Sequence, residues 1–237
     1  MKVLGLITAR GGSKGIPRKN LRALCGKPLL NYTCEAALAA KLDRVVLSTD
    51  DAEIREVGVN AGVEVPFLRP AELAAAEAGS FGVVEHALGW LNEHGWFADI
   101  VVLLQPTSPL RRSEHIDHTL SVLLQSGADA AVTIVKLPHN YSPFSIMQVG
   151  VDGILENWWQ SRVDFDPLRR QDHPALVARN GPAVLAVRTE ALRREQVLYC
   201  KRMVGVEMSL LDSIDIDGEP DLIMAEALLM RHRGLAV

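Results

Sequence analysis

A glycine-rich basic loop directly follows the first apolar segment of the chain, and its residue types are those that bind phosphate. Residues 3–20 read Val-Leu-Gly-Leu-Ile-Thr-Ala-Arg-Gly-Gly-Ser-Lys-Gly-Ile-Pro-Arg-Lys-Asn. The glycines can adopt positive φ and expose backbone N–H groups to a polyanion. The countercharge comes from Arg10, Lys14, Arg18 and Lys19. The spacing matches neither a Walker A loop nor Gly-x-Gly-x-x-Gly, which argues against P-loop NTPases and dinucleotide-binding proteins. The loop therefore predicts another kind of phosphate site, with a glycine turn beside a solvated basic segment as the alternative.

A second chemical feature lies near the end of the chain, where Asp215 and Asp217 stand two residues apart. In an extended segment such side chains project to one face, so both carboxylates could bind one hard Mg²⁺ ion. Taken alone, an Asp-x-Asp pair is more often a helix cap or a solvated turn. Asp212 is three residues before Asp215 and turns away from the pair, so we leave it out of the predicted metal shell.

Six segments resemble the acylneuraminate cytidylyltransferases, the CMP-sialic acid synthetases, and they occur in the order that this family shows. The segments are 9–21 (Ala-Arg-Gly-Gly-Ser-Lys-Gly-Ile-Pro-Arg-Lys-Asn-Leu), 48–51 (Ser-Thr-Asp-Asp), 69–73 (Arg-Pro-Ala-Glu-Leu), 104–111 (Leu-Gln-Pro-Thr-Ser-Pro-Leu-Arg), 180–181 (Asn-Gly) and 212–217 (Asp-Ser-Ile-Asp-Ile-Asp). The related synthetase for the eight-carbon sugar Kdo opens instead with an Arg-Tyr-x-Ser-Thr-Arg-type loop, which this chain lacks. The resemblance implies transfer of CMP from CTP to an acidic nine-carbon sugar.

The resemblance also implies which residues bind the nucleotide. The implied set is Ala9, Arg10, Gly11, Gly12, Ser13, Lys14, Lys19, Asn20, Arg69 and Ser80. Lys14 and Lys19 are the candidate phosphate contacts. Arg69 and Ser80 match positions that recognise the cytosine and ribose, although a surface arginine and a plain helix cap are the alternatives.

The implied chemistry is an in-line attack of an acceptor hydroxyl on the α-phosphorus of CTP, which releases pyrophosphate without a covalent enzyme intermediate. The implied catalytic residues are Arg10, Lys14, Lys19, Gln105 and Asp215. Asp215 and Asp217 coincide with the family's metal motif, which favours Mg²⁺, with Mn²⁺ as a second choice. Because no histidine lies in a family motif, the proton acceptor is either Asp215 or a hydroxide on the metal.

The implied contacts to the acidic sugar are Gln105, Arg170, Gln171, Asn180 and Tyr199. The guanidinium of Arg170 suits the acceptor carboxylate, whereas the adjacent Arg169 should point elsewhere.

The acid side departs from the sialate-type pattern at three places. Val184 stands where a tyrosine is expected, Leu198-Tyr199 replaces a Phe-Phe pair, and the stretch 139–145 lacks a lysine. The acceptor therefore stays open between sialic acid, another nonulosonic acid and a different acid such as a keto acid or a phosphonate. A catalytically silent protein that senses CTP or CMP is the alternative of another class, although such a sensor needs no metal aimed at the α-phosphate.

Composition predicts one globular domain, because the 237 residues are 48% hydrophobic and 23% charged. A net charge of -4 and a pI near 6.0 argue against nucleic-acid or membrane-surface partners. Residues 1–9 are too short for a signal peptide, and no stretch reaches the ~18 apolar residues of a membrane helix, so we expect a cytoplasmic protein. The three widely separated cysteines indicate neither a disulfide framework nor a zinc site.

Apolar strand patterns alternate with amphipathic helical patterns, which predicts an α/β fold: a mostly parallel twisted sheet with helices on both faces. The resemblance implies the Rossmann-like nucleotidyltransferase version of this fold. Predicted strands cover 2–9, 44–48, 99–104, 129–135, 182–187 and 203–207, and predicted helices cover 28–42, 113–126, 190–194 and 219–232. Two further helices should follow caps at Asp50 or Asp51 and at Ser80. The motif residues then fall at carboxyl ends of strands, where open α/β sheets bind ligands.

Apolar spacing predicts the buried face of each helix. The expected inward residues are Ile54 and Val57; Phe81, Val84, Leu88 and Leu91; Ile116, Leu120 and Leu123; and Leu222, Ile223, Ala227 and Met230.

The alternation fails over 137–172, where proline, aromatic and charged residues gather. We interpret this stretch as an inserted arm. In the family such an arm exchanges between two subunits and helps to close the acid-sugar pocket, so the resemblance implies a homodimer.

Overall fold

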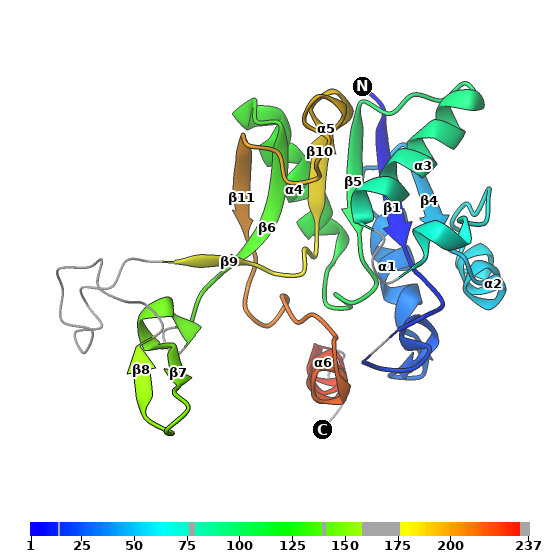
Figure 1. Ribbon diagram of the computed structural model, residues 1–237. Helices are drawn as coiled ribbons and strands as arrows, with labels where there is room; N and C mark the ends of the chain where they lie inside the picture. The colour runs from blue at the N-terminus through cyan, green and yellow to red at the C-terminus, as the bar shows by residue number, and fades with distance from the viewer. Residues whose placement is uncertain (14, 76–78, 139–140, 158–175, 233–237) are drawn as a thin grey trace.

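The computed structural model describes residues 1–13, 15–75, 79–138, 141–157 and 176–232, which fold around one central sheet (Figure 1). The sheet has seven strands in the order β11-β6-β10-β5-β1-β4, with β9 paired to β6. Its strands are β1 (Val3–Thr8), β4 (Arg44–Ser48), β5 (Ile100–Leu104), β6 (Ala130–Lys136), β9 (Val177–Arg179), β10 (Leu185–Arg188) and β11 (Met203–Glu207). The helices are α1 (Leu29–Leu38), α2 (Ala52–Asn60), α3 (Ser80–Glu93), α4 (Ser113–Ser126), α5 (Thr189–Glu195) and α6 (Glu219–His232).

The sheet is mostly parallel, as predicted. β1 runs parallel to both neighbours, so that Leu6 lies between Val46 of β4 and Leu103 of β5. Its apolar run is buried on both sides, which is typical of a strand between two helical layers. β10 runs antiparallel to β5 and β6, and β11 is again parallel to β6. β10 is thus an antiparallel strand inserted between parallel ones, and β9 also runs antiparallel to β6.

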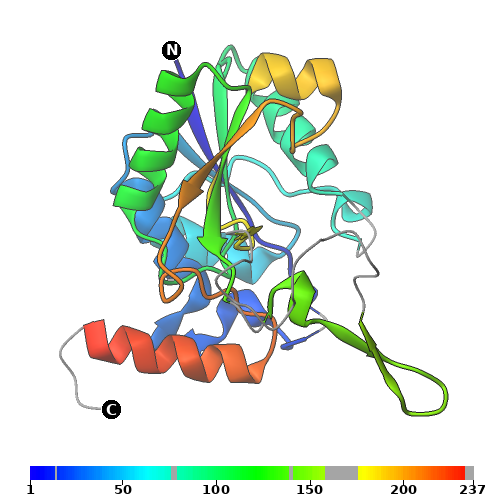
Figure 2. The same cartoon turned by 90° about the vertical axis from the view of Figure 1, so that its left-hand side faces the viewer.

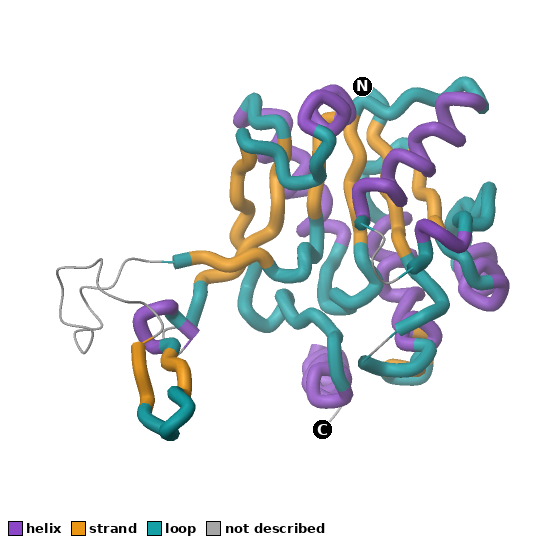
Figure 3. Tube along the Cα trace, viewed as in Figure 1, coloured by secondary structure: helices purple, strands orange, loops and turns teal. Residues whose placement is uncertain are grey.

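Helices cover both faces of the sheet, which confirms the predicted architecture (Figures 2 and 3). On one face α1, α2 and α4 pack through residues such as Leu30, Ile54 and Leu120. On the other face α3 and α5 pack through Leu88 and Leu192. The inward face predicted for α4 is buried as expected, and in α3 only the first residue of the face is partly exposed.

The terminal helix α6 lies beyond the carboxyl ends of the strands and builds a third cluster (Figure 1). Its Leu222, Ala225 and Leu229 pack with Ile16 and Leu24, which follow the glycine-rich loop. The bounds of α6 match the prediction, but the predicted inward residue Ile223 is 67% exposed. Periodicity located the helix, whereas the surface against which it packs belongs to a distant part of the chain and sets which face is buried.

The predicted helix cap at Asp51 is confirmed, whereas those at Asp50 and Ser80 need correction. The Asp51 carboxylate caps α2 by accepting from the Glu53 and Ile54 N–H groups, both at 3.0 Å, and Asp50 is not a cap. Gly79 occupies the N-cap position of α3, so Ser80 is its first helical residue. The hydroxyl of Ser80 is therefore not used as a cap.

Several boundaries also differ from the sequence pattern. The predicted helix 28–42 ends at Leu38, because the chain turns there and the Lys41 N–H donates to Asp117 Oδ1 of α4 at 2.7 Å. The strand predicted at 182–187 begins only at Leu185. Short elements that the pattern did not predict are η1 (Lys19–Leu21), β2 (Ala23–Leu24), β3 (Lys27–Pro28), η2 (Ala71–Leu73) and β9.

Residues 137–138 and 141–157 are the described part of the predicted arm; residues 139–140 and 158–172 lie outside the described residues. The short helix η4 (Pro143–Ser145) precedes a two-stranded antiparallel hairpin of β7 (Met147–Val149) and β8 (Leu155–Asn157). The hairpin projects from the body of the fold (Figures 1 and 2). Within the described ranges, no helix has both the length and the apolar character needed to cross a bilayer.

Candidate active site

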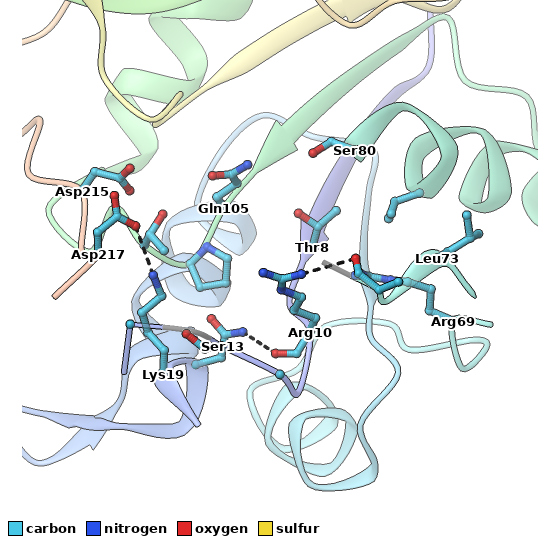
Figure 4. A pocket seen from close by; sticks show the side chains of 17 residues that line it. Thr8, Arg10, Ser13, Lys19, Arg69, Leu73, Ser80, Gln105, Asp215 and Asp217 are labelled. Atoms are coloured by element: carbon cyan, nitrogen blue, oxygen red, sulfur yellow. Dashed lines mark hydrogen bonds and ion pairs between the residues drawn. The ribbon is translucent and has the colours of Figure 1, made fainter. Parts of the chain in front are cut away.

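A cavity of about 400 Å³ opens at the carboxyl ends of β1 and β5 (Figure 4). Its size falls in the range of small-ligand pockets, roughly 300–1,000 Å³. The lining residues are Thr8, Arg10, Gly12, Ser13, Gly15, Lys19, Asn20, Arg69, Leu73, Ala75, Ser80, Val83, Gln105, Pro106, Thr107, Asp215 and Asp217. The glycine-rich loop and the aspartate pair, almost 200 residues apart in the sequence, therefore share one cavity.

Side chains from within and beyond the glycine-rich loop form hydrogen bonds to its backbone. Asn20 is buried, and its Nδ2 donates to the Arg10 carbonyl at 2.9 Å. Asp50 Oδ1 accepts from the Gly11 N–H at 3.1 Å, so this amide is already engaged. Arg18 turns away from the cavity and forms ion pairs with Asp51 and Glu53, unlike the other described cations of the loop. Among the described residues of the loop, the cations that face the cavity are Arg10 and Lys19.

At one end of the cavity, Lys19 meets the aspartate segment (Figure 4). Its Nζ donates to the Ile216 carbonyl at 2.6 Å and lies 3.4 Å from Asp217 Oδ1. Ile216 is fully buried between the two aspartates, which leaves both carboxylates on the cavity side. Asp217 is 85% exposed, whereas Asp215 is partly buried. This arrangement is the one that the two-residue spacing predicted.

The glycine-rich loop also touches the aspartate segment through its backbone. A Cβ atom built on Gly15 would lie 2.1 Å from the Asp217 carbonyl oxygen. Only glycine allows the two segments to approach this closely, because the atom that a Cβ would meet belongs to the backbone and cannot rotate away as the end of a side chain could. The close approach fixes the distance between the loop and the carboxylates.

The Asp215 carboxylate could accept a bond from a ligand. Its Oδ1 is buried, and although the Thr107 hydroxyl lies beside the carboxylate, no described group reaches this oxygen with good hydrogen-bond geometry. Burial raises the pKa of Asp215 above its usual range, the nearby Thr107 hydroxyl opposes the shift, and the negative charge of Asp217 adds to it. A cation bound between the two carboxylates would satisfy this oxygen and offset the charge.

The donor set fits a cation that is shared with a substrate. Among the described residues, no group of three or more His, Cys, Asp or Glu side chains is placed to hold an ion. Two carboxylates cover only part of an octahedral shell, and Mg²⁺ commonly completes such a shell with water and substrate phosphate oxygens.

At the opposite end of the cavity lies Arg69, which is 7% exposed (Figure 4). Its Nε donates to Ser48 Oγ at 3.1 Å and its Nη2 to the Ser48 carbonyl at 2.5 Å, so the carboxyl end of β4 fixes the guanidinium. Burial lowers the pKa of Arg69 below its usual value. The surface-arginine alternative is therefore wrong for this residue.

Gln105 follows β5 and faces the cavity between the two ends (Figure 4). Its carbonyl accepts from Arg111 Nη1 at 2.9 Å and from Thr33 Oγ1 at 3.4 Å. Sequence reasoning included Arg111 in a motif but gave it no role, because nothing in the local pattern indicates that this arginine is buried.

Other predicted site residues lie away from the cavity lining. Ala9 is fully buried and donates its N–H to the Ser48 carbonyl at 3.1 Å. The Asn180 Nδ2 donates to Ser213 Oγ at 2.9 Å, and its Oδ1 accepts from the Ala183 N–H at 3.4 Å. Tyr199 packs against the core, with the Arg179 guanidinium 4.1 Å from its ring centroid. Lys14, Arg170 and Gln171 lie outside the described residues, and their roles stay predictions.

Asn180 and Asp212 both stabilise the segment that carries the aspartate pair. Asn180 bonds Ser213, two residues before Asp215. Asp212 accepts from Arg112 Nη1 at 2.9 Å and from the Ser209 hydroxyl at 2.9 Å, and it does not line the cavity.

Comparison with known proteins identifies the family of this chain. A family model described as Cytidylyltransferase matches residues 4–151. The chain is 42% identical over 241 residues to a CMP-N,N'-diacetyllegionaminic acid synthase of Legionella pneumophila, with 97% of each chain covered. It is 31% identical over 227 residues to an N-acylneuraminate cytidylyltransferase of Streptococcus agalactiae, covering 94% of this chain. The chain spans 52% of that relative's length, about half. It is also 41% identical over 127 residues to a pseudaminic acid cytidylyltransferase of Campylobacter jejuni, covering 53% of this chain and 55% of that protein.

Two solved structures share the fold at low sequence identity. One is a CMP:2-keto-3-deoxy-manno-octonic acid synthetase complexed with CTP, with a TM-score of 0.72 and 17% identity over 98% of this chain and 100% of that chain. The other is a 4-diphosphocytidyl-2C-methyl-D-erythritol synthase from Anaerococcus prevotii, with a TM-score of 0.63 and 16% identity over 97% and 96%. These likenesses confirm the predicted nucleotidyltransferase fold. The family model covers more than half of the chain and one relative matches it almost end to end, so the chain belongs to the cytidylyltransferases and is an enzyme.

Proposed function

We propose that this enzyme transfers CMP from CTP to a hydroxyl of an acidic nonulosonic sugar and releases pyrophosphate. The observation that carries the proposal is the shared cavity, in which a cationic glycine-rich loop faces two carboxylates. The two segments approach each other closely at Gly15. The three relatives are named for CMP-diacetyllegionaminic, N-acylneuraminic and pseudaminic acid chemistry, which supports an acidic nine-carbon acceptor. A reaction that consumes CTP also favours the cytoplasm.

The two ends of the cavity suggest how CTP lies in it. The fixed guanidinium of Arg69 is a donor for the cytosine, and Ser80, which also lines the cavity, is a candidate contact to the nucleoside (Figure 4). Arg10, Ser13 and Lys19 then face the triphosphate. Positive charge and backbone N–H groups along the tail stabilise the charge that builds up on the departing pyrophosphate.

We also propose that Asp215 and Asp217 hold Mg²⁺, with Mn²⁺ as a substitute. When bound there, the metal would neutralise phosphate charge and orient the α-phosphate. The protein's own contribution is to keep the two carboxylates on one side of the buried Ile216 and to hold Lys19 beside them. The proton of the attacking hydroxyl would pass to Asp215 or to a hydroxide on the metal. Asn180, Tyr199, Arg170 and Gln171 stay sequence predictions on the acid side.

Pyrophosphate release from CTP, measured against a panel of acids, tests the proposed function. The panel contains legionaminic, pseudaminic and N-acetylneuraminic acids, Kdo, and a phosphonate. We expect release with one or more nine-carbon acids. Release only with Kdo or the phosphonate would show a different acceptor, and CTP binding without release under all conditions would indicate the silent sensor.

Nucleotide choice is a separate prediction from the same cavity. With a working acceptor, CTP should be preferred over UTP, ATP and GTP. The buried N–H groups of Arg69 need acceptor atoms on the base, which cytosine presents. A base that leaves one of these buried groups unpaired would bind more weakly by about 1–3 kcal/mol. Pyrophosphate release at equal concentrations of each nucleotide measures this. Equal rates from UTP and CTP would refute the placement of the cytosine at Arg69.

We further propose that the chain forms a homodimer through the arm. The β7–β8 hairpin pairs only with itself among the described strands, and its exposed apolar residues are Met147, Val149, Val151, Ile154 and Leu155. An isolated two-stranded hairpin is marginally stable in water, so a second copy that covers these side chains would stabilise it. Sedimentation velocity should give the mass of two chains. A variant with Val149→Asp and Leu155→Asp should shift toward one chain, and an unchanged mass would place the interface elsewhere.

A further inference from the structure

A buried arginine lies behind the cavity and bonds only neutral oxygens. Arg111 is 2% exposed and does not line the cavity. Its Nη1 donates to the Gln105 carbonyl at 2.9 Å and to the Ala183 carbonyl at 2.8 Å, and its Nη2 donates to the Thr33 hydroxyl. Burial lowers the pKa of Arg111 to about 10. The negative charge of Asp215 opposes this shift without cancelling it, so holding the cation here is costly and core packing alone does not account for an arginine at this position.

The partners of Arg111 belong to three separate parts of the fold that meet behind the cavity. Thr33 lies on α1, Gln105 follows β5, and Ala183 lies in the turn that leads into β10. Thr33 also donates to the Gln105 carbonyl, so this carbonyl is held from two directions. Because the carbonyl carbon is bonded to Cα, holding the carbonyl restricts the position of the Gln105 Cα atom, from which the side chain enters the cavity.

The turn at 181–183 connects Arg111 to the other side of the cavity. The Ala183 carbonyl is bonded to Arg111, and its N–H is bonded to Asn180. A Cβ atom built on Gly181, in the same turn, would lie 3.4 Å from Asp215 Cγ. One guanidinium therefore ties the backbone of Gln105 to the turn that backs Asp215.

We propose that Arg111 is a positioning residue for CMP transfer: without touching either substrate, it sets the placement of Gln105 relative to the 181–183 turn. This inference rests on the proposed function, in which Gln105 lies near the reacting centre. Lysine cannot replace the arginine, because one ammonium group cannot reach two carbonyls and a hydroxyl in the geometry of a planar guanidinium.

The test compares Arg111→Lys with the adjacent Arg112→Lys, each in wild-type and in Gln105→Ala backgrounds. Arg112 is half-exposed and does not line the cavity, and lysine can keep its ion pair with Asp212, so this variant is the matched control. Arg111→Lys should lower kcat/KM for the acid by about 10²-fold, as a small misplacement of a reacting group can. The Kd for CTP should change only a few-fold, and Arg112→Lys should stay close to wild type.

The double variants separate positioning from a general structural role. If Arg111 acts through Gln105, Arg111→Lys should cost little more once Gln105 is alanine. The inference is overturned if the full loss recurs in that background, if Gln105→Ala or Arg111→Lys alone is harmless, or if CTP binding weakens as much as turnover. Should Arg111→Lys not fold, Thr33→Val removes the hydroxyl between Arg111 and Gln105, and it should show the same dependence on Gln105 with a smaller loss.

A readout without turnover separates this inference from the proposed function. The side-chain amide of Gln105 can be assigned in a ¹H–¹⁵N spectrum as the pair of signals that Gln105→Ala removes. Those signals should shift in Arg111→Lys and stay in place in Arg112→Lys. If wild type releases no pyrophosphate with any acid, the proposed function fails while this spectrum still decides whether Arg111 positions Gln105; unshifted signals in Arg111→Lys overturn the inference.

Discussion

Asp215→Asn should lower kcat by about 10²-fold or more while the protein stays folded. The substitution keeps the size of the side chain but removes the charge from a buried carboxylate that we propose as a metal ligand. Asp217→Asn should act in the same direction, because it removes the second carboxylate and the partner of Lys19. Initial rates at saturating Mg²⁺ and CTP, with a working acid, measure both effects.

Stability should respond to Asp215→Asn in the opposite sense. Burial raises the folded-state pKa of Asp215, so above that pKa the folded protein carries the cost of the buried charge, and below it protonation relieves the cost. Without metal at neutral pH, the asparagine variant should therefore unfold at the same temperature as wild type or higher. Glu56→Gln, on an exposed position of α2, is the control for loss of a carboxylate. Near-wild-type kcat in both aspartate variants would show that the pair is only a turn.

Gly15→Ala should lower kcat/KM by about 10²-fold and also weaken CTP binding. The added Cβ would lie 2.1 Å from the Asp217 carbonyl oxygen, and no side-chain rotation can relieve a clash with backbone. The glycine-rich loop and the aspartate segment must then separate, which changes the spacing between Lys19 and the carboxylates. Overpacking of this kind also costs about 1–3 kcal/mol of stability.

The matched control for this variant is Gly89→Ala on α3. A Cβ atom built there meets nothing within 4 Å, and alanine favours a helix by roughly 0.5–1 kcal/mol over glycine. Gly89→Ala should keep full activity and be at least as stable as wild type. Isothermal titration with CTP and thermal unfolding of both variants measure the contrast. If Gly15→Ala binds CTP and turns over like wild type, the close approach is not needed for function.

Local signals in the sequence were sufficient to predict the longer helices and strands, and to single out the glycine-rich loop and the aspartate pair. The bounds of α4, β11 and α6 agree with the pattern, because each has a clear apolar period and a clear start or end. The glycine loop and the aspartate pair were recognisable from residue type and spacing, and the structure brings them to one cavity.

The burial and direction of a side chain could not be predicted from local sequence signals where residues far away in the chain determine them. The exposure of Ile223 depends on the cluster around Ile16, which α6 meets only in the folded chain. The burial of Arg111 depends on Thr33 and Ala183, which lie more than 70 residues away on either side. Arg18 looked like its neighbours in the loop, yet Asp51 and Glu53 draw it away from the cavity. In each case a long-range contact decides, and periodicity contains no information about it.

The central claim is that this chain joins CMP to an acidic sugar by cleaving CTP between its α- and β-phosphorus atoms. A ³¹P NMR spectrum of the enzyme with CTP, Mg²⁺ and the panel of nonulosonic acids tests it most directly. We expect one new phosphodiester signal, from a CMP-sugar, to grow together with an equal amount of pyrophosphate. Signals of CDP and orthophosphate, or of pyrophosphate with free CMP and no phosphodiester while the acid is unconsumed, would contradict the account.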